Sequence, residues 1–335
     1  MVRPATVLTP RPAGLYCPPA DLYIDPIHPV DRAVITHGHA DHARPGHGRV
    51  LATAQTLAIM EARYGAGFAG SVQALDYGES LMVDGVELIL KPAGHILGSA
   101  QAVIRHRGLT LVVSGDYKRR RDSTCAPFEP ERCHVFVTEA TFGLPVFRHP
   151  PAEQEIARLL AVREEAPQRP ILIGAYALGK AQRLIALLRE AGFDAPIPVH
   201  GALESLNALY GRFGVDLGPL ESATTIPPSA LEGAIVLAPP GALATPWRRR
   251  FRDPLTGIAS GWMRVRARAR RQGVELPLVI SDHADWDELT LTLSELRPEE
   301  VWITHGREEA LMRWCELKGL SARALAIVGY DEESE

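Results

Sequence analysis

The chain has 335 residues and a formal net charge of −4, with 46% hydrophobic and 23% charged residues. These are ordinary values for a globular protein with a sizeable core, and they argue against a disordered, collagen-like or coiled-coil chain. No apolar run approaches the ~20 residues of a membrane span, and the first residues lack the apolar stretch of a secretory signal.

The first part of the chain, up to about residue 150, predicts short strands separated by turns. Its clearest helix is expected at 55–63, where apolar residues recur with a helical period. The strands are expected at 22–24, 33–36, 86–90, 109–114 and 135–138.

From about residue 151 the pattern changes to alternating helices and strands, a rhythm typical of a small parallel sheet. Helices are expected at 153–165, 180–191 and 203–213, and strands at 171–175 and 234–237. A strand at 278–280, a helix at 286–296, a strand at 301–304 and a helix at 308–318 complete the fold. We therefore expect an outer domain formed by residues 1–150 and 277–335, interrupted by an inserted α/β domain at 151–276.

The strongest chemical signal is the segment Thr-His-Gly-His-Ala-Asp-His, which directly follows an apolar run. It places His37, His39, Asp41 and His42 within six residues. Imidazole and carboxylate are ligands typical of zinc, iron or manganese. The alternative is a polar loop whose histidines bind nothing.

Three further ligand candidates stand where an apolar strand enters a Gly-rich turn. They are His95 in Ala-Gly-His-Ile, Asp116 in Ser-Gly-Asp-Tyr, and His305 in Ile-Thr-His-Gly. Taken singly, a histidine at a strand end is more often a hydrogen-bonding or core residue, and an aspartate after glycine usually forms a turn. Their order after the histidine-rich segment favours the metal interpretation.

These motifs together resemble the metallo-β-lactamase fold, a four-layered αββα sandwich with a dinuclear metal site at one edge. The resemblance rests on the histidine-rich segment, on His95 in its glycine-rich turn and on Asp116, in that order. Asp25, in Tyr-Ile-Asp-Pro, stands where that fold places an aspartate that supports the ligand loop.

Later motifs resemble those of the β-CASP nucleases, which include Artemis-type DNA nucleases and RNA 3′-end-processing endonucleases. The motifs are Val-Thr-Glu139-Ala-Thr, Ser-Asp-His283-Ala-Asp and Thr-His305-Gly, and Lys180 stands in a segment that resembles a helix start of the β-CASP insert. The resemblance covers essentially the whole chain. Residues 259–266 followed by 281–286 are most similar to bacterial DNA ligase-associated exonucleases.

The chain departs from the RNA-processing relatives in two ways. Arg307 stands where they usually carry an acidic residue, and the insert is short compared with theirs. Both departures count against an RNA-processing role. The presence of His305 separates the chain from the Artemis-type branch.

The resemblance implies two divalent metal ions, zinc or manganese, and a role for each motif residue. The first ion would bind three histidines and the second Asp41 and two histidines, with Asp116 bridging them. The two histidine sets are His37, His39 and His95 for the first ion, and His42 and His305 for the second. His283 would protonate the leaving oxygen, and Glu139 would orient His283. The alternative for Glu139 is a solvated carboxylate at a strand end.

Basic residues cluster at 118–121, 248–252 and 264–271, although the whole chain is mildly acidic. Such clusters suit a polyanionic ligand, and we expect Lys180 and the arginines of the last cluster to contact nucleic acid. If that cluster forms a strand, one face carries Arg264, Arg266, Arg268 and Arg270. A helix is the other possibility, because Ala and Arg are strong helix formers. The alternative is a solvated charged face.

The sequence therefore predicts a metal-dependent exonuclease that acts on DNA ends in repair, with a DNA ligase and a helicase as functional neighbours implied by the resemblance. An RNA-processing ribonuclease, a small-molecule hydrolase and a non-catalytic nucleic-acid-binding scaffold are the alternatives. Four cysteines without a CxxC pattern fit a reducing cytoplasm.

Overall fold

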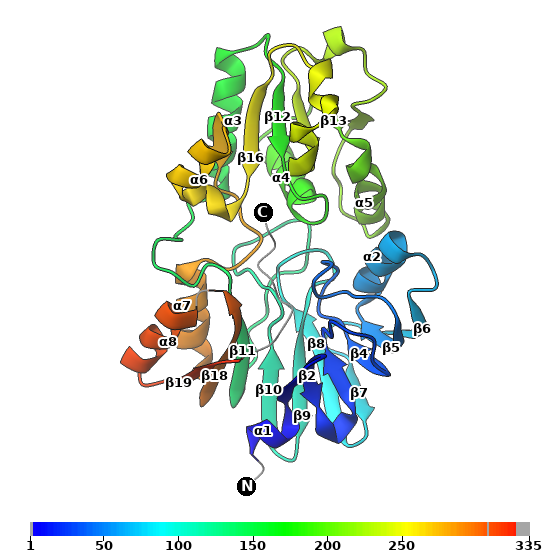
Figure 1. The fold of residues 1–335 in the computed structure, drawn as a ribbon, viewed down its shortest axis with the longest axis vertical. Helices are drawn as coiled ribbons and strands as arrows, with labels where there is room; N and C mark the ends of the chain where they lie inside the picture. Colours follow the sequence, from blue (N-terminus) through cyan, green and yellow to red (C-terminus); the bar gives the residue numbers. More distant parts are fainter. Residues whose placement is uncertain (1–2, 307, 326–335) are drawn as a thin grey trace. The chain divides into compact units, whose positions relative to one another are not determined.

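The computed structural model describes residues 3–306 and 308–325. The chain divides into two compact units. Unit 1 contains the residues up to Arg148 and those from His283 onward, and unit 2 contains His149–Asp282 (Figure 1). Among the described residues, no helix is long and apolar enough to cross a membrane.

The first sheet of unit 1 is mixed and has six strands in the order β1-β2-β3-β4-β5-β6. Strands β1 to β3 pair antiparallel, and β3 to β6 pair parallel. The bounds are β1 (Thr9–Arg11), β2 (Gly14–Cys17), β3 (Leu22–Ile24), β4 (Arg32–Val34), β5 (His47–Ala52) and β6 (Ala69–Ala74). The helices of this part are α1 (Pro4–Val7), the short η1 (Pro18–Ala20) and α2 (Ala54–Tyr64).

The second sheet of unit 1 has seven strands in the order β19-β18-β11-β10-β9-β8-β7. Its strands are β7 (Ser80–Val83), β8 (Val86–Pro92), β9 (Ala100–His106), β10 (Leu109–Val113), β11 (Val135–Ala140), β18 (Glu300–Gly306) and β19 (Ser321–Ala324). Strand β9 pairs antiparallel with both β8 and β10, and β10, β11, β18 and β19 pair parallel. Strands β8, β10, β11 and β18 therefore share one direction, and their carboxyl ends share one edge.

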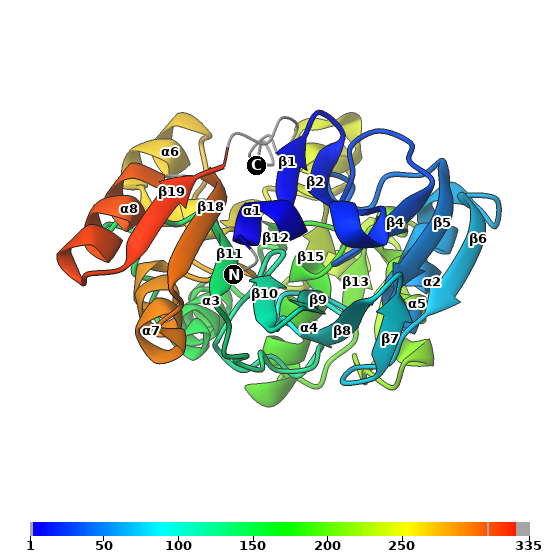
Figure 2. The ribbon, with the colours of Figure 1, turned by 90° about the horizontal axis from the view of Figure 1, so that it is seen from below.

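The two sheets of unit 1 pack face to face, as Figure 2 shows, and helices cover their outer faces. Successive side chains of a strand point to opposite faces. On β10, Leu111 and Val113 join the core between the sheets, whereas Val112 packs with α7 (Trp286–Leu296) and α8 (Glu308–Leu317). On β4, Val34 faces the inter-sheet core and Ala33 packs with α2. Unit 1 is thus a helix–sheet–sheet–helix sandwich.

Unit 2 contains a six-stranded parallel sheet in the order β14-β13-β15-β12-β16-β17. Its strands are β12 (Ile171–Gly174), β13 (Ile197–Val199), β14 (Leu220–Ser222), β15 (Ile235–Ala238), β16 (Leu255–Ala259) and β17 (Leu276–Leu278). Its helices are α3 (Ala152–Glu165), α4 (Lys180–Glu190), α5 (Gly201–Arg212) and α6 (Arg266–Arg271), with short 3-10 turns η2 (Pro228–Leu231), η3 (Pro240–Ala244), η4 (Pro246–Arg250) and η5 (Gly261–Arg264).

One detail of the sequence prediction was wrong, and the structure decides one alternative that the sequence left open. The strand expected at 278–280 lies at Leu276–Leu278 and pairs with β16, so it extends the sheet of unit 2, and unit 1 resumes at His283 rather than at 277. The alternating pattern at 264–271 does not form a strand, because Arg266–Arg271 form helix α6. Ala and Arg both favour a helix, which decides the alternative left open.

Candidate metal centre

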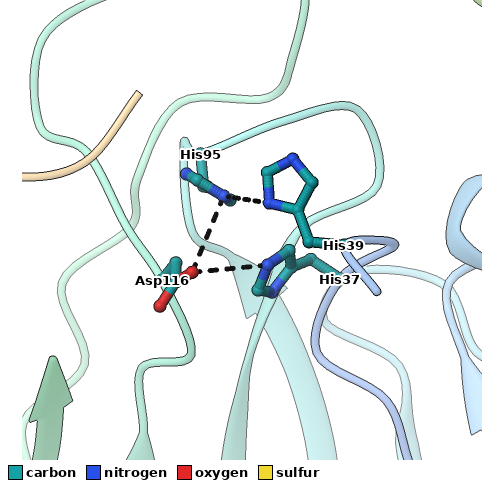
Figure 3. A group of neighbouring side chains, drawn as sticks. All are labelled: His37, His39, His95 and Asp116. Atoms are coloured by element: carbon teal, nitrogen blue, oxygen red, sulfur yellow. Dashed lines mark hydrogen bonds and ion pairs between the residues drawn. The ribbon is translucent and has the colours of Figure 1, made fainter. Parts of the chain in front are cut away.

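The predicted ligands of unit 1 come from loops and strand ends that the topology brings to one edge. The histidine-rich segment follows β4, His95 follows β8, Asp116 follows β10, and His305 lies near the end of β18. Four side chains form a buried group whose ligand atoms all lie within 4.8 Å of one another (Figure 3). They are His37, His39, His95 and Asp116.

The geometry of this group suits a metal ion. His39 Nδ1 lies 3.0 Å from His95 Nε2, and Asp116 Oδ2 lies 3.4 Å from His37 Nε2 and 3.8 Å from His95 Nε2. Among the described residues, the buried His37 Nε2 has no hydrogen-bond partner. A buried polar atom without a partner is costly, and a divalent ion would satisfy it. Three imidazoles and a carboxylate are a donor set that fits zinc or manganese.

The second predicted set also surrounds Asp116. His42 Nε2 lies 3.5 Å from Asp116 Oδ2 and 3.6 Å from Asp41 Oδ2, and His305 Nε2 lies 3.4 Å from Asp116 Oδ1. Asp116 Oδ2 thus faces histidines of both sets and Oδ1 faces His305, so this carboxylate lies between the two sets. The rings of His42 and His305 are 6.2 Å apart, so this set is more open than the first.

Hydrogen bonds at Nδ1 orient two of the ligand histidines, His37 and His42. His42 Nδ1 donates to Asp25 Oδ2 at 2.8 Å, and Asp25 also accepts from the Thr36 backbone N–H at 2.7 Å and the Thr36 hydroxyl at 2.5 Å. Because that hydroxyl gives its proton to Asp25, it can only accept from His37 Nδ1, which lies 3.1 Å away. In both rings Nε2 is then left to act as the ligand atom, as outer partners of metal-bound histidines usually ensure.

Burial and charge shift the proton equilibria of the cluster in opposite directions. Burial lowers the pKa of His37. Burial also opposes charge on His42, but the carboxylates of Asp116, Asp41 and Asp25 outweigh it and raise the pKa of His42 to about 10. For Asp116, burial is outweighed by the surrounding histidines, which hold the pKa of its carboxyl well below the usual range. Without a metal, His42 therefore keeps a proton that metal binding must displace.

Gly94 brings the His95 turn against the loop that follows Asp116. Its φ of +77° is one that glycine adopts readily. A Cβ at this position would overlap the carbonyl oxygen of Lys118 and lie 3.0 Å from the backbone nitrogen of Phe128. The Lys118 N–H also donates to the Ala93 carbonyl at 3.1 Å. The two ligand-bearing turns therefore pack backbone to backbone.

Next to the cluster, Glu139 at the end of β11 pairs with His283. His283 Nδ1 donates to Glu139 Oε2 at 2.9 Å and lies 3.9 Å from Asp116 Oδ2. Glu139 is 1% exposed and also accepts from the Tyr117 N–H at 2.8 Å and the Thr141 hydroxyl at 2.7 Å. It is therefore no solvated carboxylate.

Asp116, Glu139 and His283 also lie close enough together to hold an ion. The three hydrogen bonds that Glu139 accepts leave its oxygens little capacity for a metal. The bond to Glu139 occupies His283 Nδ1, so Nε2 is the atom from which His283 can give a proton outward.

The residues expected to contact nucleic acid lie in unit 2 and differ in exposure. Lys180 is only 3% exposed; its Nζ lies 3.9 Å from Asp282 and 4.9 Å from the ring centroid of Tyr176. In the basic segment (Arg264–Arg271), Arg268 is half-buried over the ring of Trp262 at 4.8 Å. The other three predicted contacts, Arg264, Arg266 and Arg270, are exposed.

Sequence reasoning missed the residues that hold the loop after Asp116. Glu288 accepts two backbone N–H groups from this loop, and Asp285 accepts from the side chain of Arg120. The sequence signal was present, since Asp285 and Glu288 have the spacing of a helix capping box, but that spacing predicts only a helix start.

No family model matches the chain. A probable DNA ligase from Opitutus terrae is 29% identical over 326 residues, which are 96% of this chain and 31% of that protein. Endoribonuclease ysh1 from Schizosaccharomyces pombe is 32% identical over 123 residues, which are 36% of this chain and 16% of that protein. The chain thus spans less than a third of the length of either relative.

A crystal structure of a protein of unknown function from Enterococcus faecalis has a similar fold. The TM-score is 0.59 with 14% sequence identity, covering 91% of this chain and 81% of that one. The sandwich of unit 1 and its histidine and carboxylate cluster define an α/β protein with a candidate metal centre. The cluster contains His37, His39, His95 and Asp116, on which the sequence resemblance to the metallo-β-lactamase fold rests.

Proposed function

We propose that the protein is a metal-dependent phosphodiesterase that removes nucleotides from DNA ends during repair. The observation that carries this proposal is the buried cluster of three histidines and Asp116 beside the Glu139–His283 pair. A metal cluster with an adjacent, carboxylate-held imidazole provides the groups that phosphodiester hydrolysis needs. Unit 2 would be the β-CASP insert.

The residues around Asp116 would hold two divalent ions, zinc or manganese. The first would bind His37, His39 and His95, the second Asp41, His42 and His305, and Asp116 both. When bound, such ions supply Lewis-acid stabilisation of phosphate charge and activate a water molecule. Asp25 and Thr36 would keep the Nε2 atoms of His42 and His37 directed at the ions.

His283 would act as the general acid through Nε2. Its Nδ1–H is held by the buried carboxylate of Glu139, which fixes the orientation of the ring. The proton would pass from Nε2 to the oxygen that leaves when the phosphodiester bond breaks. Glu139 would keep the ring in place during this transfer, because its other hydrogen bonds tie it to Tyr117 and Thr141.

The preference for DNA is supported by the relative named as a probable DNA ligase, which matches nearly the whole chain. The name of that relative also supports a functional association of this chain with a DNA ligase, and we propose a helicase as a further functional neighbour. The exposed arginines of the basic segment would contact the phosphate backbone. The ysh1 endoribonuclease supports the second candidate, an RNA-processing ribonuclease, but over a shorter part of the chain.

The test is a product analysis on end-labelled single- and double-stranded DNA and RNA, with Mg²⁺, Mn²⁺ or Zn²⁺ added to metal-free protein. We expect mononucleotides or short products released progressively from one end of DNA. The Asp116→Asn variant is the control and should be inactive. Internal cuts in RNA with intact DNA would support the ribonuclease instead, and no cleavage of either would refute both.

A further inference from the structure

The loop that follows Asp116 is fixed to the start of α7 by one buried carboxylate. Glu288 Oε1 accepts the backbone N–H of Arg119 at 2.8 Å and that of Arg120 at 2.7 Å. Glu288 is 6% exposed, and its other oxygen accepts the Asp285 N–H at 3.1 Å. A single side chain therefore joins two segments that are more than 160 residues apart in sequence.

The same two segments contact each other on either side of Glu288. The Arg120 side chain donates to Asp285 Oδ2 at 2.6 Å. On the other side, the Ala284 N–H donates to the Tyr117 carbonyl at 2.6 Å. Asp116 precedes Tyr117, and His283 precedes Ala284. The proposed metal bridge and the proposed general acid thus each lie one residue from the same backbone hydrogen bond.

Helix capping alone does not account for Glu288. In a capping box, the side chain at the third helical position needs one oxygen, and glutamine serves as well as glutamate. Here Asp285 Oδ1 accepts the Glu288 N–H at 3.0 Å, and Glu288 returns one oxygen to Asp285. The second oxygen faces two N–H donors outside the helix. Only a carboxylate offers acceptors on both sides.

We propose that Glu288 is a positioning residue, which holds the loop after Asp116 against the start of α7 and so sets His283 opposite the metal cluster. This inference rests on the proposed function, in which His283 is the acid. Asp116 is enclosed by its own histidines, so loss of the Glu288 contacts should displace the His283 turn more than the metal ligands. In Glu288→Gln, the NH2 of the amide must face either the two loop N–H groups or the Asp285 N–H. In either orientation an N–H donor faces another donor and loses its acceptor.

The test compares two substrates with the full-length, metal-loaded protein. One is a single-stranded oligodeoxynucleotide, and the other is the p-nitrophenyl ester of thymidine 5′-phosphate. The first needs a proton on its leaving oxygen, whereas nitrophenolate leaves without one. For Glu288→Gln we expect kcat on the oligonucleotide to fall about tenfold and kcat on the ester to change less than about twofold. KM and metal content should stay the same.

Glu295→Gln is the matched control. Glu295 lies on the same helix and binds the side chain of Arg119 at 2.7 Å, but not the loop backbone. We expect both of its rates to equal those of the unaltered protein. A Glu288→Gln variant that loses both activities equally, or loses metal in proportion to activity, would overturn the positioning role, since a merely structural contact predicts that result.

Two further variants keep the proposal open to refutation. If Glu288→Gln does not fold, Arg120→Gln removes the ion pair with Asp285 from a side chain that is 35% exposed. It should change the substrate ratio in the same direction, by about threefold, and an unchanged ratio would refute the role. His283→Ala tests the underlying function separately. If it lowers both rates equally, the general-acid assignment itself fails.

Discussion

Replacing Gly94 by alanine should damage both the stability of unit 1 and its metal binding. The new Cβ would overlap the carbonyl oxygen of Lys118, which belongs to the loop after Asp116. This oxygen and the nearby nitrogen of Phe128 are both backbone atoms, so no side-chain rotation can relieve the overlap. The His95 turn and the Asp116 loop must separate, although His95 Nε2 and Asp116 Oδ2 now lie only 3.8 Å apart.

The magnitude follows from two contributions. An alanine held at a φ of +77° costs roughly 1–2 kcal/mol. Overpacking against fixed neighbours typically adds about 1–3 kcal/mol. We therefore expect a loss of about 2–5 kcal/mol in the free energy of unfolding. Gly108 provides a matched control, because its φ is +83° and a Cβ there would have nothing within 4 Å. Gly108→Ala should therefore reduce the free energy of unfolding only by the backbone cost of roughly 1–2 kcal/mol.

The assay is urea unfolding of both variants in metal-free form, followed by a metal titration against a chromophoric chelator. Gly94→Ala should unfold at clearly lower urea than Gly108→Ala and should bind metal more weakly. Equal unfolding midpoints with equal metal affinities would refute the view that these two turns must touch to assemble the site.

Three other predictions concern the metals, the acid and the basic segment. Elemental analysis of the metal-loaded protein should give about two ions per chain, because one catalytic zinc uses only three or four protein ligands. The His283→Ala variant should keep both metal ions, and its kcat on DNA should fall about 10²–10⁴-fold. Since the pKa of His42 is raised to about 10, its ring is protonated at neutral pH, and metal affinity should rise about tenfold per pH unit between about pH 6 and 8. Calorimetry in buffers of different ionisation enthalpy should show that metal binding releases about one proton. A binding heat that does not depend on the buffer would contradict this. Replacing Arg264, Arg266 and Arg270 by Gln should flatten the log–log salt dependence of single-strand binding by up to about two units, and an unchanged slope would exclude the basic segment as a contact surface.

The sequence predicted elements whose apolar residues follow a helical period or form a continuous run, such as the buried strands β12 and β15. Helix α7 was expected at 286–296 and has these bounds, because its apolar residues follow the helical period. Strand β6 was missed since it is exposed along nearly its whole length and shows no alternation. Strand β9 was missed for the opposite reason. It is buried, but two of its residues are alanines and Gln101 is satisfied by the carbonyls of Pro92 and Glu129.

The residue types of the candidate site were visible in the sequence, whereas their pairing was not. His283 and Glu139 are 144 residues apart and meet only because β11 ends beside the start of α7. Nothing local to either residue predicts a 2.9 Å hydrogen bond between them. Their association came from family resemblance. The role of Thr36 could not be inferred at all, because it depends on which atom of Asp25 faces its hydroxyl.

The basic clusters show why charge patterns along a chain do not identify a binding surface. Lys118, Arg119 and Arg120 form the densest run of positive charge near Asp116, yet each is paired: with Asp122 at 2.6 Å, Glu295 at 2.7 Å and Asp285 at 2.6 Å. Two of these partners lie far away in sequence, Glu295 on α7 and Asp285 at its N-cap. To reach Lys118 or Arg120, a phosphate would have to displace the buried carboxylate of Asp122 or Asp285, which is costly. Within the described part of the chain, the exposed arginines of the basic segment form no such ion pair, so they are the better candidates for backbone contacts.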